Sequence, residues 1–169
     1  MKSDAVPTHC LGCDPGLSGA FALLNVSTRK IEGIWDMPIV DERVYPQGVA
    51  VIVDMAKSIA GDSIVAAVEN VSSMPRQAGA FNFGRSAGVV HGVLGALGVP
   101  MELVSPNIWK GAMGLRKMAG ETQDQNKTRA RELAIKLWPS NASEFKRVKD
   151  DGRAEACLIA RQYANSKGY

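Results

Sequence analysis

Four acidic residues stand where their carboxylates could act together. Asp14 opens the glycine-rich run Asp14-Pro-Gly-Leu-Ser-Gly-Ala20, and Glu69 ends an apolar run that begins at Ile64. Asp151 and Glu155 lie four residues apart at the start of a helix-like segment. Hard cations such as Mg²⁺ take oxygen ligands, and a pair of them can activate a water and clamp a phosphate. The pattern therefore predicts a site for two divalent metal ions, provided that the fold brings these segments together.

Each acid also has a structural interpretation. Asp151 suits a helix start, where it can cap the backbone and interact with the helix dipole. Two acids four apart share one helix face, and they repel each other by a few tenths of a kcal/mol, on the order of 0.3, unless something neutralises them. Glu155 is followed by the apolar residues Ala156 to Ala160 and has less structural reason to be there. The combination favours a metal site over four unrelated structural acids.

Hydrophobic periodicity predicts strands that alternate with helices. A glycine- and proline-rich turn after Asp14 and a polar turn at 26–30 join the first three strands, so these form an antiparallel meander. Later crossovers through helices favour parallel pairing, as in layered α/β folds. The sequence thus predicts an α/β fold, a mixed five-stranded sheet flanked by helices, in one domain that spans 1–169 with 1–7 flexible. The expected strands are 9–13, 20–25, 31–37, 64–68 and 101–104, and the expected longer helices are 47–60, 78–97, 124–138 and 151–164.

Composition sets outer limits. The 169 residues are 46% hydrophobic and 22% charged, as in an ordinary globular protein, and no apolar stretch reaches the roughly 20 residues of a membrane span. The N-terminus lacks a signal-like pattern, so we expect a cytoplasmic protein without a membrane partner. Cys10 and Cys13 form a CxxC inside a predicted strand, without a second Cys/His pair at a usable spacing. We therefore expect buried or incidental cysteines rather than a redox or zinc site.

Charge is distributed unevenly along the chain. Residues 1–75 hold 5 basic and 9 acidic side chains, whereas residues 76–169 hold 15 and 8. A basic half beside a cluster of acids fits a polyanionic partner held near metal ions. Solvated helix faces would explain the same counts equally well.

The acidic motifs resemble those of RuvC-type Holliday junction resolvases in the ribonuclease H-like superfamily. The matching segments are Asp14-Pro-Gly-Leu-Ser-Gly-Ala20, Val68-Glu69-Asn70 and Asp151-Gly-Arg-Ala-Glu155-Ala-Cys-Leu-Ile-Ala160, in that order, and the resemblance covers roughly residues 9–164. It implies a ribonuclease H-like fold. Two features depart from the bacterial pattern. The last two acids are four apart rather than three, with Asp150 as the alternative ligand to Asp151. An aromatic wedge residue is missing after Glu69, so any wedge must be Met74 or Phe81, or must be absent. The variant pattern is nearer to phage-type members.

The resemblance implies a homodimeric, metal-dependent endonuclease that nicks four-way or other branched DNA in recombination, repair or phage DNA processing. It implies two Mg²⁺ ions per site, replaceable by Mn²⁺ and held by Asp14, Glu69, Asp151 and Glu155, and no nucleotide cofactor. Lys127 would assist catalysis, and Lys110 matches a second lysine important in bacterial relatives. The expected location is a bacterial cell or a phage-infected host.

Basic residues of the second half are expected to contact DNA phosphates. The predicted set is Arg76, Arg85, Lys110, Arg116, Lys117, Lys127, Arg129 and Arg131. For Arg129 and Arg131, a solvated helix face paired with Glu132 is an equal alternative. Trp109 and Trp138 are expected in the core. The helix at 78–97 carries small residues every three or four positions, which suits either a dimer interface or packing on the sheet.

Three other function classes compete with the junction nuclease. An actin-like sugar kinase or ATPase also begins with an Asp-Gly phosphate turn, but it needs a second phosphate loop and a second domain. A non-catalytic branched-DNA binding module would keep the fold and is expected to lose acids. A ribonuclease H acting on RNA–DNA hybrids would use the same acids on a different substrate.

Overall fold

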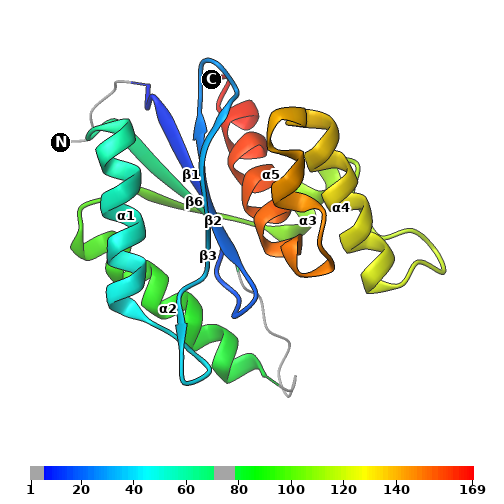
Figure 1. Ribbon diagram of the computed structural model, residues 1–169, viewed down its shortest axis with the longest axis horizontal. Coiled ribbons are helices and arrows are strands. Elements are labelled where there is room, and N and C mark those ends of the chain that lie inside the picture. Colours follow the sequence, from blue (N-terminus) through cyan, green and yellow to red (C-terminus); the bar gives the residue numbers. More distant parts are fainter. Residues whose placement is uncertain (1–5, 71–78) are drawn as a thin grey trace.

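The computed structural model describes residues 6–70 and 79–169. Its centre is a five-stranded sheet with the order β3-β2-β1-β6-β7 (Figure 1). Strands β1, β2 and β3 pair antiparallel, whereas β6 pairs parallel with β1, and β7 pairs parallel with β6. The predicted mixed sheet is confirmed, with β1 in its middle. The strands span His9–Asp14 (β1), Ala20–Asn25 (β2), Ile31–Asp36 (β3), Ile64–Glu69 (β6) and Met101–Val104 (β7).

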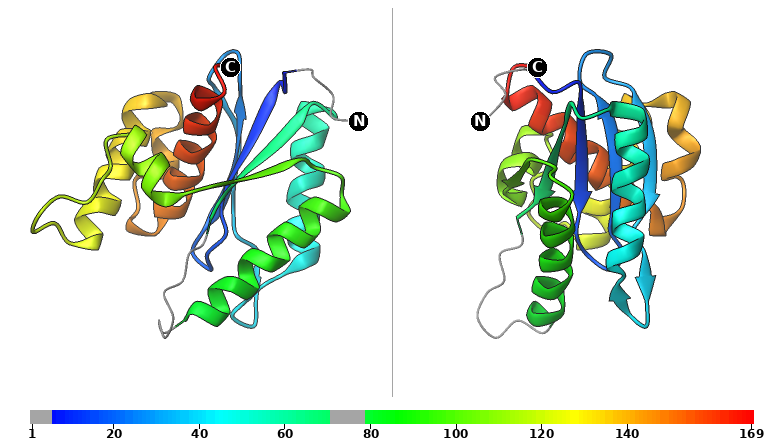
Figure 2. Two further views of the ribbon diagram at one scale, coloured as in Figure 1. Left: turned by 180° about the vertical axis from the view of Figure 1, so that it is seen from behind. Right: turned by 90° about the vertical axis from the view of Figure 1, so that its left-hand side faces the viewer.

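Helices cover both faces of this sheet (Figures 1 and 2). One face carries α1 (Pro46–Ala60) and α2 (Ala80–Ala96). The other side holds α3 (Pro106–Ala112), α4 (Gln123–Leu137) and α5 (Asp151–Ser166), with α5 against the strands. The four longer helices begin and end within two residues of the predicted bounds. None of the described helices is long and apolar enough to cross a bilayer.

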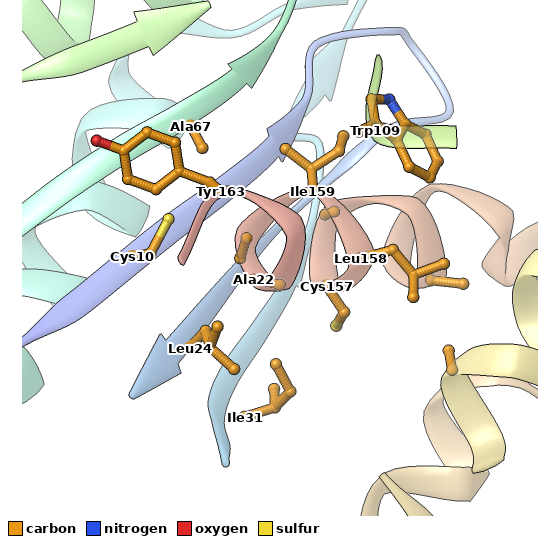
Figure 3. Close-up of a cluster of buried hydrophobic side chains, with 14 of the residues drawn as sticks. Cys10, Ala22, Leu24, Ile31, Ala67, Trp109, Cys157, Leu158, Ile159 and Tyr163 are labelled. Carbon is orange, nitrogen blue, oxygen red and sulfur yellow. The ribbon is translucent and has the colours of Figure 1, made fainter. Parts of the chain in front are cut away.

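Alternation along β1 divides the core into two halves. Cys10 faces α5, whereas Leu11 and Cys13 face α1 and α2, because successive side chains of a strand point to opposite faces. Figure 3 shows the α5 half, where Cys10 and Leu24 of the strands pack with the α5 side chains. All three cysteines are buried and free, as expected.

Gly12 fixes where α5 crosses β1. A Cβ at Gly12 would lie 2.1 Å from the carbonyl oxygen of Ala156 and 2.9 Å from Cβ of Ala160. Only a glycine lets the helix backbone approach the strand so closely. The crossing point in turn decides which α5 side chains reach the end of β1.

A small hairpin, β4 (Ile39–Val40) and β5 (Arg43–Val44), is an element that sequence analysis does not predict. Its two-residue loop, Asp41 and Glu42, has φ of 48° and 56°, the left-handed pattern of a tight hairpin turn. Asn-Gly or Asp-Gly normally marks such a turn, so Asp-Glu gives no signal. Two 3₁₀ turns, η1 (Pro139–Phe145) and η2 (Val148–Asp150), then lead into α5.

Candidate active site

Asp14 and Glu69 lie side by side at the carboxyl ends of two neighbouring inner strands. β1 and β6 are parallel neighbours, and their register pairs Cys13 with Val68, so the next residue of each strand is an acid. Both acids continue the alternation that points Cys10 and Ala67 toward α5. The sheet therefore presents two carboxylates on the same face, at the carboxyl ends of its central strands.

Helix α5 brings the other two acids to the ends of β1 and β6. Its first turn packs against the loop after Asp14, where a Cβ at Gly152 would lie 2.3 Å from the carbonyl oxygen of Ser18. Asp151 and Glu155 then face the strand ends, and all four acids line one cavity of about 240 Å³. Its lining is completed by Gly16, Ser18, Phe83, Lys110, Gln123, Asn126, Lys127 and Gly152.

Asp14 is the most perturbed carboxylate of this cavity. Burial, together with the negative charges of Glu155 and Glu69, raises its pKa to about 7. The N–H of Gly16 donates a hydrogen bond of 3.1 Å to Asp14 Oδ1, which acts in the opposite direction and fixes the carboxylate in the turn. Asp14 is thus repelled by two other carboxylates of the cavity, Glu155 and Glu69.

Glu69 is held by a buried indole. The Nε1–H of Trp109 donates to Glu69 Oε1 at 2.9 Å, and the Trp109 side chain is fully buried. Burial and the charge of Glu155 raise the pKa of Glu69, whereas the Trp109 hydrogen bond and Lys110 lower it. The expected core position of Trp109 is confirmed, and its ring also orients a carboxylate of the cavity.

Trp109→Phe isolates this hydrogen bond. The ring keeps its apolar packing, but a buried carboxylate loses its donor, so we expect the protein to lose about 2 kcal/mol of stability. The pKa of Glu69 rises further, because the hydrogen bond favours its charged form. Carbon NMR titration of labelled glutamate carboxyls checks the direction, and a pKa that stays constant or falls would contradict this account of Glu69.

Cationic side chains engage the two α5 acids. Lys110 Nζ lies 3.1 Å from Glu155 Oε1, and Lys127 Nζ lies 3.0 Å from Asp151 Oδ2. Arg131 Nη1 donates to Asp151 Oδ1 at 2.9 Å. Among residues 6–70 and 79–169, no three or more His, Cys, Asp and Glu side chains are arranged to hold a metal ion as they stand. The acids share a cavity, and the α5 pair is bound to cations of the protein itself.

The donor set nevertheless fits a hard cation. The acids contribute carboxylate oxygens, the ligands that Mg²⁺ and Mn²⁺ prefer. Mutual repulsion contributes to the raised pKa values of Asp14 and Glu69 even beside two lysines, so a further positive charge would be stabilising there.

Asp150 is directed elsewhere. Its carboxylate accepts hydrogen bonds from the backbone N–H of Arg147 at 2.8 Å and from Arg147 Nε at 3.0 Å. Burial raises the pKa of Asp150, but the bonds from Arg147 outweigh burial and the net shift is downward. Asp151 lines the cavity, and Asp150 closes the turn before α5.

Arg129 and Arg131 form their contacts inside the protein. Arg129 bonds Glu121 at 2.7 Å and the carbonyl of Gly114 at 2.6 Å, whereas Arg131 bonds Asp151 and the carbonyl of Val148. None of these contacts involves Glu132, so the alternative in which the two arginines pair with Glu132 is not the arrangement that the structure shows. The helix pattern shows which residues share a face, but the partners come from the loop before α4 and from the start of α5.

The structure describes three of the four remaining predicted basic residues. Arg116 and Lys117 line a second cavity, which also includes Lys110. Of the residues that the structure describes, Arg85 on α2 lines neither cavity. Arg76 and Met74 lie outside the described residues.

Several cavity residues were missed from the sequence. Phe83 of α2 approaches the turn after Asp14, where a Cβ at Gly16 would lie 3.2 Å from its ring. Gln123 and Asn126 enter from the first turn of α4. The sequence offered one signal, the uncharged polar side chain of Asn126 in a basic helix. The structure places this side chain on the buried side of the helix.

The comparisons with known proteins concern the fold. No protein-family model matches the chain, and no curated protein does. The similar solved structures include "Thermus thermophilus RuvC structure" and "T. thermophilus RuvC in complex with Holliday junction substrate". Each has 15% sequence identity and a TM-score of 0.63, and the match covers 94% of this chain and 96% of that one. The chain therefore has the ribonuclease H-like fold of RuvC.

Proposed function

We propose that this protein is a metal-dependent, structure-selective endonuclease that nicks four-way or other branched DNA. One observation carries the proposal: Asp14, Glu69, Asp151 and Glu155, from three distant segments, line one cavity in a RuvC-like fold. One of the similar RuvC structures is a complex with a Holliday junction substrate. The basic second half of the chain supplies the charge that such a polyanion requires.

The four acids would hold the divalent ions, with Asp151 rather than Asp150 as the α5 ligand. Bound there, Mg²⁺ or Mn²⁺ supplies an activated water and a counter-charge for the phosphate oxygens. Trp109 orients Glu69, and Arg131 orients Asp151. Gly16 has no side chain beside the Asp14 carboxylate, where a Cβ would lie 3.4 Å from Asp14 Oδ1, so that a phosphate can approach it.

Lys127 and Lys110 are proposed to act on the phosphate itself. Both reach the cavity, and both are held there by ion pairs with α5 acids. Burial lowers the pKa of Lys127, but its hydrogen bond to Asp151 and the negative charges of Asp151, Glu155 and Asp14 together outweigh burial, so the net shift is upward and the group stays charged. An ammonium at this place can orient a phosphate and offset the charge that develops during cleavage.

Substrate comparison tests the proposed function. A synthetic four-way junction, a linear duplex and an RNA–DNA hybrid of matched sequence are incubated with Mg²⁺. We expect nicks in the junction that leave 5′-phosphate and 3′-hydroxyl ends, and little cutting of the other two. Faster cleavage of the hybrid would point to a ribonuclease H instead.

A non-catalytic branched-DNA binding module is the second candidate. The ion pairs Lys110–Glu155 and Lys127–Asp151 favour it, because they partly neutralise the acids without any metal. Calorimetric titration with Mn²⁺ discriminates the two: a nuclease binds the ion at this cavity, and the binding disappears in Asp14→Asn. Junction binding with neither metal binding nor cutting would favour the module.

Dimerisation along α2 belongs to the same proposal, since paired nicks in a two-fold junction require two sites. Gly84, Gly88, Gly92 and Gly95 lie on the exposed side of α2, where an added Cβ would meet nothing within 4 Å. Exposed small residues at this spacing allow a second helix to approach closely.

Gly88→Gln tests this surface. The monomer gains about 0.5 to 1 kcal/mol of helix stability, because a glycine is replaced in open space. The longer side chain blocks close helix packing, so light scattering is expected to show a wild-type dimer and a monomeric variant at micromolar concentration. A wild-type monomer would refute the interface.

A further inference from the structure

A basic groove adjoins the acidic cavity. It has a volume of about 670 Å³, and its lining includes Asn107, Lys110, Arg116, Lys117, Gln123 and Asn126. Lys110, Gln123 and Asn126 also line the acidic cavity, so the two hollows are direct neighbours. No acid lines the groove among the described residues. A DNA strand with one phosphate at the acids would therefore pass over a cationic surface next to them.

The loop that forms one wall of this groove is residues 113–122, between α3 and α4. It carries Arg116 and Lys117, which are both exposed. Gly114 and Gly120 adopt left-handed backbone conformations, with φ of 70° and 77°. Apart from Met113 and Leu115 at its start, its side chains contribute little to the apolar core, so polar contacts give residues 116–122 their shape.

Glu121 supplies several of these polar contacts. Its side chain is 4% exposed, and its carboxylate accepts hydrogen bonds from the Met118 N–H at 2.8 Å and from Arg129 at 2.7 Å. Arg129 in turn donates to the carbonyl of Gly114, and Asn126 donates to the carbonyl of Leu115 at 2.8 Å. Both ends of the loop are thereby fastened to α4.

Arg116 of this loop is positioned against helix α3. Its guanidinium lies against the backbone of α3, where a Cβ at Gly111 would be 2.8 Å from Arg116 Nε. The loop therefore contacts both α3 and α4, and it forms one wall of the groove between them. The Glu121 carboxylate holds the Met118 N–H, and two further bonds support this part of the loop: the Glu121 N–H donates to the Met118 carbonyl at 3.1 Å, and Arg129 donates to the Arg116 carbonyl at 3.4 Å.

We propose that Glu121 is a positioning residue for DNA binding, which holds Arg116 and Lys117 along the groove so that they contact phosphates of the strand entering the acidic cavity. Arg129, predicted from the sequence to touch phosphates, acts instead as the partner that keeps Glu121 in place. This inference rests on the proposed function and refines it, because it names the path of the substrate strand.

The sign of the mutational effect separates positioning from simple charge. Glu121 is an acid beside a basic groove, so as an ordinary charge it repels DNA, and its removal should strengthen binding. As a positioning residue it has the opposite effect: Glu121→Gln removes repulsion but loosens the loop, so binding weakens. Glu132→Gln, the same change at an exposed site of α4, is the matched control.

The experiment measures equilibrium binding of a labelled four-way junction without divalent ions, over a series of salt concentrations. We expect Glu121→Gln to bind about tenfold more weakly, and the slope of log affinity against log salt to fall by about 1 to 2 as phosphate contacts are lost. Glu132→Gln should bind as well as wild type or better. In an Arg116→Ala/Lys117→Ala background, Glu121→Gln should have no further effect.

Limited trypsin digestion reports the loop independently of DNA. Cleavage after Arg116 and Lys117 should be faster in Glu121→Gln than in Glu132→Gln, while circular dichroism shows that both variants are folded. If Glu121→Gln does not fold, the double alanine variant still shows whether the groove binds phosphates, and unchanged binding there would overturn the proposal. Equal or tighter binding of folded Glu121→Gln would overturn it as well. Absence of junction binding by the wild type would instead remove the proposed function.

Discussion

Asp14→Asn is expected to abolish DNA cleavage, by about a thousandfold or more, while junction binding is retained. Asp14 lies at the meeting point of Glu69 and Glu155, and both raise its pKa. An amide keeps the shape of the side chain and its contact with the turn, but it removes the charge that a divalent ion requires. Single-turnover cleavage of a four-way junction, with binding measured in parallel, checks both outcomes.

Asp150→Asn is the control for this loss. The change is chemically the same and lies next to Asp151, but Asp150 is paired with Arg147 outside the cavity. We expect some loss of stability, since the pKa of Asp150 is lowered in the folded protein, and retention of cutting. Mg²⁺-dependent nicking by Asp14→Asn, or complete inactivity of folded Asp150→Asn, would contradict the assignment of the acids.

Asp14→Asn should also be more stable than the wild type at neutral pH. The pKa of Asp14 is about 7 in the folded chain against an ordinary 3.8, so between these pH values the folded state binds more protons. Stability therefore falls as pH rises through this window, by up to about 4 kcal/mol from this group. Asp14→Asn removes the fall, and urea denaturation of both proteins at pH 5 and pH 8, without divalent ions, measures the difference.

Gly12→Ala is expected to destabilise the protein by about 3 kcal/mol or more and to disturb the acidic cavity at the same time. The added methyl would lie 2.1 Å from the carbonyl oxygen of Ala156, so α5 must move away from β1. Because α5 carries Asp151 and Glu155, its displacement separates these acids from Asp14. Denaturant unfolding and junction cleavage should therefore both show a loss.

Gly84→Ala provides the comparison, since a Cβ there would meet nothing within 4 Å. It makes the same chemical change in an exposed helix, where alanine is favoured over glycine by about 1 kcal/mol. A stable, active Gly12→Ala would mean that α5 is not fixed at this crossing. An equal loss in both variants would mean that the effect is not local.

Much of the framework could be predicted from the sequence, because the governing signals are local. The meander follows from short apolar strands around glycine-rich turns, and the central position of β6 follows from its continuous apolar run. Once β1 and β6 are neighbours, strand alternation places Asp14 and Glu69 on the same face. The i, i+4 spacing of Asp151 and Glu155 does the same for the helix.

What could not be predicted depends on contacts between distant segments. Trp109 is 40 residues from Glu69, and nothing in its local sequence shows that its indole bonds a carboxylate. Arg129 and Arg131 are on a recognisably basic helix, but their partners belong to a loop and to α5. The choice between Asp150 and Asp151 depends on the turn η2, whose geometry is set by Arg147. Side-chain partners follow from packing, and packing follows from the whole fold.

Helix α5 has a consequence for the order of events during synthesis. It supplies two of the four acids and packs across the central strand, yet it is made after every other helix and strand described here. A nascent chain that stops before residue 151 carries Asp14 and Glu69 without their counterparts. The proposed site is thus incomplete until the segment 151–166 has been made and has packed against β1.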